Sequence, residues 1–249
     1  MRSILTLAGA LLLGSLNAQA ADCLPPGATD ALLKSEYHYL AGRKVPAMQH
    51  AIEDGRLKLA IAPATIPGKP GCAAALEMSI AQSDIDEVAR SFEQNPAKRI
   101  MLMSQGYALP ESTRINTVFS FDPATLAVAH ADTLHSGELG KSRATIELLY
   151  ATQSQLRAVI PDNASNAVPW SDALKTRQTA ACTKKMSARD TAAACACRND
   201  ALAKTVGERQ MEYVEYLFSD PYSYATGALA TFNALAEQVN SRCGLKPAR

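Results

Sequence analysis

Two histidines and one carboxylate lie within a stretch of six residues, at His130, Asp132 and His135. Imidazole and carboxylate groups are common metal ligands and can also act as the acid and base of a hydrolase. On a regular strand, His130 and Asp132 face the same side and His135 faces the opposite side. Only a bend at residues 133–136 brings the three side chains together. We therefore favour a solvated strand end followed by a polar turn, with a metal or hydrolytic site as the alternative.

Cys195 and Cys197 are the other group with reactive chemistry, because close cysteines can act as a redox pair or bind a metal ion. At 3.6 residues per turn, helical positions two apart point about 200° away from each other. The two sulfur atoms should therefore reach different neighbours, and each most simply bonds to Cys182 or Cys243. Structural disulfides are the favoured interpretation, and metal binding and redox chemistry are the alternatives.

The six cysteines fall into two groups along the chain. Cys23 and Cys72 lie in the first third, and the other four lie in the last 70 residues, at Cys182, Cys195, Cys197 and Cys243. An even number of cysteines in an exported chain favours disulfides. We expect Cys23 to pair with Cys72 and the other four to pair among themselves, in a pattern that the sequence leaves open.

Residues 1–20 have the pattern of a cleavable signal peptide: a basic start, an apolar run and small residues before a cleavage site between Ala20 and Ala21. The apolar run is too short to cross a bilayer, which takes about 20 residues. A lipid anchor would need a cysteine directly after the small residues, but Asp22 precedes Cys23. We expect an exported protein, periplasmic or secreted, without an integral membrane segment after signal removal.

Charge gives little sign of a polyanionic partner. Loss of Arg2 with the signal leaves equal numbers of basic and acidic residues, 24 of each. The segment Lys175–Arg209 carries eight Lys or Arg residues against three acidic ones. We interpret this segment as a solvated helical face balanced elsewhere, and we expect no nucleic acid partner.

Hydrophobic alternation predicts strands in the first part of the chain, residues 21–165. The expected strands cover residues 56–61, 76–80, 99–103, 113–121 and 126–131, with two more within 143–160. Residues 122–125 suit a type I turn between the fourth and fifth of these strands. One helix is expected from Ser83 to Phe92, with Ser83 and Asp86 as a capping box. Short connections between the strands indicate an antiparallel sheet.

The second part, residues 170–249, has the spacing of helices. Turn-forming residues at Pro161–Pro169 mark the expected boundary. Ser171 is the expected cap of the first helix, Ser187–Asp190 and Thr205–Glu208 are candidate capping boxes, and the last helix should end near Cys243. The fold class is therefore α+β: an antiparallel sheet with at least one helix, followed by a small helical region tied by disulfides.

These patterns favour an exported, non-enzymatic binding or interaction protein whose partner is a protein or a small ligand. They contain no coherent catalytic motif and predict no cofactor. One alternative is a secreted or periplasmic hydrolase that uses His130, Asp132 and His135. A structural component of the cell envelope is the other alternative.

Overall fold

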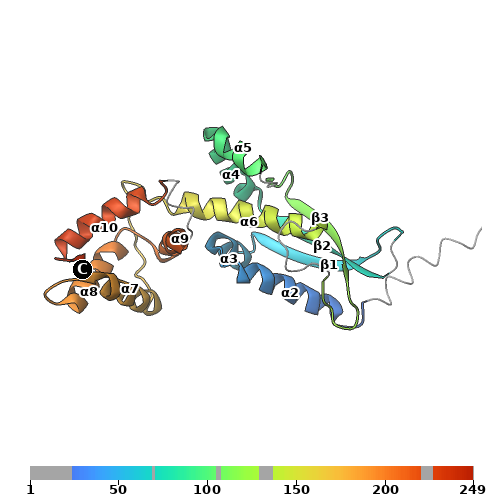
Figure 1. Cartoon of the computed structure of the whole chain (residues 1–249), viewed down its shortest axis with the longest axis horizontal. Helices are drawn as coiled ribbons and strands as arrows, with labels where there is room; N and C mark the ends of the chain where they lie inside the picture. Colours follow the sequence, from blue (N-terminus) through green and yellow to red (C-terminus); the bar gives the residue numbers. More distant parts are fainter. Residues whose placement is uncertain (1–23, 69–70, 105–107, 129–136, 220–226, 249) are drawn as a thin grey trace, which may run out of the picture. The chain divides into compact units, whose positions relative to one another are not determined.

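The computed structural model describes residues 24–68, 71–104, 108–128, 137–219 and 227–248 (Figure 1). The chain divides into two compact units. The N-terminal unit comprises the residues up to Arg43 and Met48–Leu149, and the C-terminal unit comprises Lys44–Ala47 and Tyr150–Arg249. The division at Pro161–Pro169 into domains 21–165 and 170–249 remains a prediction.

A three-stranded antiparallel sheet lies in the N-terminal unit, which confirms the predicted fold class. In spatial order its strands are β1 (Leu57–Ala64), β2 (Cys72–Ile80) and β3 (Arg114–Phe121). The predicted alternation along β3 is present: Thr117, Phe119 and Phe121 are buried, and the residues between them are exposed. Because successive side chains of a strand point to opposite faces, one face of the sheet contributes to the core.

Two helices cover this buried face, α2 (Ala28–Gly42) and α6 (Gly137–Arg157). A third helix, α3 (Pro46–Glu53), follows α2 in the sequence. α2 packs against β1. Ser142 of α6 shares a buried hydrogen bond with Thr117 of β3, and Arg143 of α6 forms an ion pair with Glu36 of α2. These contacts place α2 and α6 side by side over the sheet.

The prediction of two strands within residues 143–160 is wrong, because α6 is one helix of 21 residues. Burial around most of its circumference explains the error: Ile146, Leu148 and Leu149 are all buried, so apolar residues alternate as they would in a strand. Polar side chains are buried on α6 as well, among them Arg143 and Gln153. A helix with both properties has no clear apolar stripe in its sequence.

Residues 99–103 are also helical and not a strand. They belong to α5 (Pro96–Ser104), which follows α4 (Gln82–Gln94) after one residue. Pro96 explains the difference, since proline is favoured in the first turn of a helix. α4 confirms the predicted helix from Ser83 to Phe92, but its N-cap is Ala81 with no side-chain hydrogen bond, so the predicted capping box is wrong.

A turn follows β3 as predicted, but its closing hydrogen bond runs from the amide of Leu126 to the carbonyl of Asp122 at 2.7 Å, so it is one residue longer than the predicted type I turn. The Asp122 carboxylate accepts a hydrogen bond from the amide of Ala124 at 2.8 Å, and the Asp122 amide donates to the carbonyl of Ala127 at 2.9 Å. Of the predicted return strand 126–131, the described residues show one bridge, between Phe121 and Val128. Residues 129–131 lie outside the described part of the chain.

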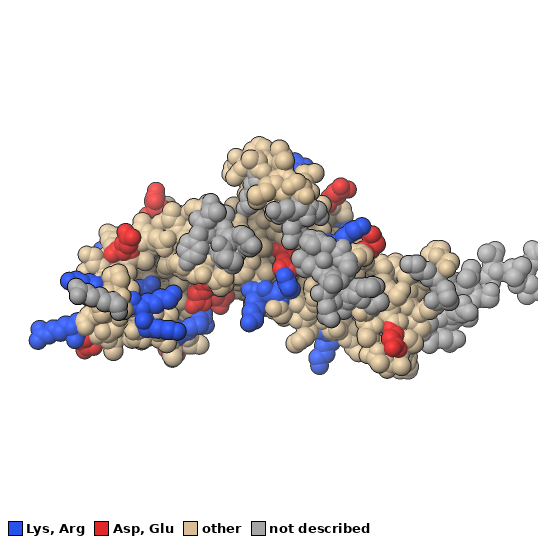
Figure 2. All heavy atoms as spheres, in the orientation of Figure 1, with Lys and Arg blue, Asp and Glu red and all other residues tan. Residues whose placement is uncertain are grey.

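The C-terminal unit is helical, as predicted. Its helices are α7 (Asp172–Lys185), α8 (Thr191–Ala203), α9 (Glu208–Ser219) and α10 (Ala230–Arg242), and a short ladder joins β4 (Met186–Ser187) to β5 (Lys246–Pro247). α8 packs against both α7 and α10. On the face drawn in Figure 2, Lys and Arg side chains gather around α7 and α8.

The helix caps in this unit agree only in part with the caps that the sequence predicted. Ser171 caps α7 as predicted, because its hydroxyl accepts a hydrogen bond from the amide of Leu174 at 3.2 Å. The cap of α8 is Asp190 and not Ser187, since the Asp190 carboxylate accepts from the amide of Ala193 at 3.1 Å. Glu208 binds the Ser171 hydroxyl at 2.6 Å and its amide at 2.8 Å, a contact across 37 residues of sequence.

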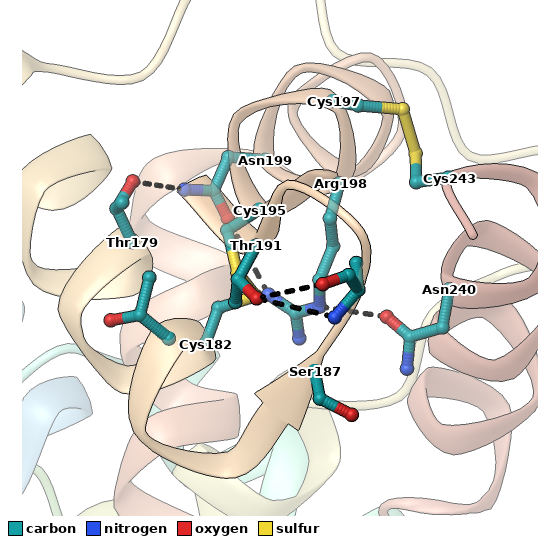
Figure 3. The surroundings of a disulfide bond; sticks show 12 residues. Thr179, Cys182, Ser187, Thr191, Cys195, Cys197, Arg198, Asn199, Asn240 and Cys243 are labelled. Atoms are coloured by element: carbon teal, nitrogen blue, oxygen red, sulfur yellow. Dashed lines mark hydrogen bonds between the residues drawn. A yellow bond between two sulfur atoms is a disulfide. The ribbon is translucent and has the colours of Figure 1, made fainter. Parts of the chain in front are cut away.

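Two disulfides tie the helices together, Cys182–Cys195 and Cys197–Cys243 (Figure 3). The predicted disulfide-tied helical region is therefore confirmed. The two cysteines of α8 reach different neighbours, as their spacing on a helix requires. Cys195 and Cys182 are buried together with Leu245.

Cys72 is also disulfide-bonded. Its predicted partner, Cys23, lies outside the described residues, as do the predicted signal peptide 1–20 and the cleavage site at Ala20 and Ala21. Of the helices in the described part of the chain, none is long and apolar enough to cross a membrane.

Candidate binding site

A hollow of about 330 Å³ lies in the N-terminal unit between α4, α5 and the segment 108–111. Figure 1 shows α4 and α5 together at one edge of this unit, beside α6. The lining is mostly apolar and comprises Ile85, Ala89, Phe92, Glu93, Arg99, Leu102, Met103, Ala108, Leu109, Pro110, Glu111 and Leu148. This volume falls in the range of sites that hold a small molecule or a few side chains of a partner.

Local sequence explains why the hollow exists. α4 buries Ile85, Val88 and Phe92 against the unit, which fixes its orientation. Asn95 alone separates α4 from α5, so the chain turns sharply and α5 packs back against α4. α5 has only nine residues. Among its large apolar side chains, Leu102 is half-buried and the others are exposed.

The outer face of α5 is apolar and open to solvent. Ile100 is 67 % exposed, Met101 is 51 % exposed and Met103 is 58 % exposed. Clusters of large apolar side chains are uncommon on the surface of monomeric proteins, and where they occur they mark interaction sites. Methionine is especially suited to this role, because its flexible, polarisable side chain adapts to partners of different shape.

Three charged side chains stand at the rim of the hollow: Glu93, Arg99 and Glu111. All three residues are exposed, and no ion pair to any of them occurs among the described residues. The rim therefore presents two carboxylates and one guanidinium to a bound molecule. An apolar centre with a charged rim is the usual anatomy of a protein interaction site.

The described lining residues offer contact surface and charge. The lining includes two carboxylates, Glu93 and Glu111, and none of those lining residues is a Ser, Cys, His or Lys. A second, more open hollow is lined by Tyr37, Ala41, Gln49, Ile52 and Glu53. Two of its polar groups already have partners: the Tyr37 hydroxyl accepts from the amide of Leu59, and Gln49 donates to the carbonyl of Ala41.

The residues that the sequence singles out for metal or hydrolytic chemistry, His130, Asp132 and His135, lie outside the described part of the chain. Within the described part, no group of three or more His, Cys, Asp or Glu side chains could hold a metal ion. A site at these three residues therefore stays a prediction.

Sequence reasoning missed the α4–α5 site because it assigned residues 99–103 to a strand. A strand would have placed Ile100 and Met101 on opposite faces of the sheet, whereas the helix exposes both. The pair Asn95-Pro96 was the available signal, since it separates two segments of helical length.

Comparison with known proteins gives no relative. No family model, no curated protein and no solved structure matches this chain.

Proposed function

We propose that this chain is an exported, non-enzymatic binding protein whose α4–α5 site takes up an apolar segment of a partner protein. The observation that carries the proposal is the apolar outer face of α5, at Ile100, Met101 and Met103, next to an apolar hollow of about 330 Å³. Burying such a face against a partner removes apolar area from water, which favours association by roughly 25 cal/mol per Å² before the costs of binding.

The rim suggests the charge of the partner. Glu93 and Glu111 outnumber Arg99, so a segment with large apolar side chains and flanking Lys or Arg residues fits the site best. Export is supported by the signal-like pattern of residues 1–20 and by the disulfides, because disulfides persist in oxidising compartments.

The test is a selection of displayed random peptides against the mature full-length chain, followed by fluorescence anisotropy with the selected peptides. We expect peptides that combine large apolar residues with Lys or Arg. The variant Met103→Glu should bind them at least tenfold more weakly, because it places a charge on the apolar face. Tenfold corresponds to about 1.4 kcal/mol.

Val168→Glu is the matched control, because Val168 is 71 % exposed and belongs to the C-terminal unit. This variant should bind the peptides as the unchanged chain does. Circular dichroism of both variants checks that the fold is kept. Failure to enrich any such peptide, or equal binding by Met103→Glu, would show that the α4–α5 site is not the binding surface.

A further inference from the structure

Four cations meet at the short β4–β5 ladder of the C-terminal unit. Lys184 and Lys185 end α7 just before β4, and Arg189 follows β4. Lys246 lies in β5, directly opposite Ser187. The ladder therefore joins basic residues that are up to 62 positions apart, and we call these four side chains the basic edge.

The positive charge of the basic edge is not balanced locally. All four residues are exposed, and none of them takes part in an ion pair within the described part of the chain. Asp190 is the one acidic residue in the segments that form the edge, and its carboxylate caps α8 through the amide of Ala193. Residues 184–190 and 246–248 together carry four cations and one anion, an excess of three positive charges within these segments.

Covalent and hydrogen-bonded connections hold the edge in place. Cys182 lies two residues before Lys184 and is bonded to Cys195, and Cys243 lies three residues before Lys246 and is bonded to Cys197 (Figure 3). The amide of Ala248 donates to the carbonyl of Lys185 at 2.9 Å. A backbone that is already ordered loses little conformational entropy when the surface binds.

We propose that the basic edge binds the surface of an anionic phospholipid membrane. All four side chains are exposed and come from the end of α7, the turn after β4 and the strand β5, which suits a broad anionic surface better than a single small anion. Clusters of four to eight Lys or Arg residues beside a membrane helix or on an amphipathic helix bind anionic lipid headgroups, and the basic edge matches the lower end of that number.

The experiment is co-sedimentation of the mature chain with vesicles of phosphatidylcholine alone or with 30 mol % phosphatidylglycerol. We expect binding only to the anionic vesicles, and weaker binding as salt is raised, because salt shortens the reach of these charges to about 10 Å at 0.1 M. The double variant Lys184→Glu with Lys185→Glu should bind at least tenfold more weakly, and Lys246→Glu should weaken binding independently.

The matched control is Lys34→Glu with Lys58→Glu, which changes the net charge equally at two exposed lysines of the N-terminal unit. This control should bind as the unchanged chain does. The proposal is overturned if anionic vesicles bind no better than neutral ones, or if both double variants behave alike. Stronger binding to duplex DNA than to vesicles, or full competition by millimolar inorganic phosphate, would also overturn it. None of these outcomes depends on the α4–α5 site.

Discussion

The ion pair between Glu36 of α2 and Arg143 of α6 gives the sharpest prediction about stability. The side chains are 2 % and 4 % exposed, so both charges are removed from water. Arg143 Nε donates to Glu36 Oε2 at 3.1 Å, and Arg143 Nη2 donates to Glu36 Oε1, so the pair is bidentate. The guanidinium also lies 4.0 Å from the centre of the Tyr39 ring.

Removal of either partner breaks this buried ion pair and takes from the remaining charge the compensation that the pair provides. For Arg143→Met or Glu36→Leu alone, we expect the free energy of unfolding to fall by about 3–5 kcal/mol. Such a loss is a large part of the roughly 5–15 kcal/mol that stabilises a typical protein. The double variant has no buried charge at this position, so it should lie within about 2 kcal/mol of the unchanged chain. The coupling energy of the cycle should then be at least about 4 kcal/mol.

The exposed ion pair between Arg43 and Glu147 provides a matched control, because its glutamate lies on the same helix, α6, and its arginine directly follows α2. Its geometry is equally good, with Nε to Oε2 at 2.8 Å, but the side chains are 40 % and 20 % exposed. Arg43→Met should therefore cost less than about 1 kcal/mol.

Urea unfolding followed by far-ultraviolet circular dichroism measures all of these variants. The reasoning is refuted if Arg143→Met costs less than about 1 kcal/mol. It is also refuted if the double variant loses as much stability as the two single variants together.

Three further predictions concern the C-terminal unit. Its unfolding can be followed by the fluorescence of Trp170, which is buried and is the single tryptophan of the chain. Ser171→Ala removes the side-chain cap of α7, so the free energy of unfolding should fall by about 1 kcal/mol in urea. Hydrogen bonds from the Ser171 side chain and amide hold the pKa of Glu208 below its ordinary value of 4.5. The stabilisation that this carboxylate provides is therefore fully present above pH 4.5 and is lost as the pH falls through the lowered pKa. The loss in free energy of unfolding caused by Ser171→Ala should accordingly be smaller at pH 3 than at pH 7. An equal loss at the two pH values would contradict this assignment. Replacing Cys197 and Cys243 by Ser opens a loop of 46 residues. On the chain-entropy model, this change should lower the free energy of unfolding by about 4 kcal/mol. A loss below about 1 kcal/mol in thermal unfolding would contradict that expectation.

Local patterns in the sequence were sufficient for several parts of the fold. Alternation predicted β1, β2 and β3, because each of these strands has one face in the core and the other more open to solvent. The spacing of Ile85, Val88 and Phe92 predicted α4 for the corresponding reason, since a helix with one buried side has a repeat of 3.6 residues. Ser171 was predictable as a cap because a cap depends only on its own helix.

Other features depend on partners that are distant in the sequence. α6 buries Arg143 and Ser142, which would be costly without Glu36 and Thr117, and these partners come from two other elements. The sequence of α6 therefore fits a strand period as well as a helical one, and local reasoning chose the strand. The pairing of the four tail cysteines is likewise set by the way α7 and α10 pack against α8.

The two proposed binding surfaces also depend on tertiary packing and not on local sequence. The sequence by itself determined an export-like start, a set of cysteines, an α+β pattern and a basic segment at Lys175–Arg209. Only the tertiary structure decided that Ile100, Met101 and Met103 stand in solvent, and that the β4–β5 ladder places Lys246 opposite Ser187, beside the segment that carries Lys184 and Lys185. Exposure and proximity are properties of packing, because they depend on what the rest of the chain leaves uncovered, and a local pattern of residue types does not contain that information.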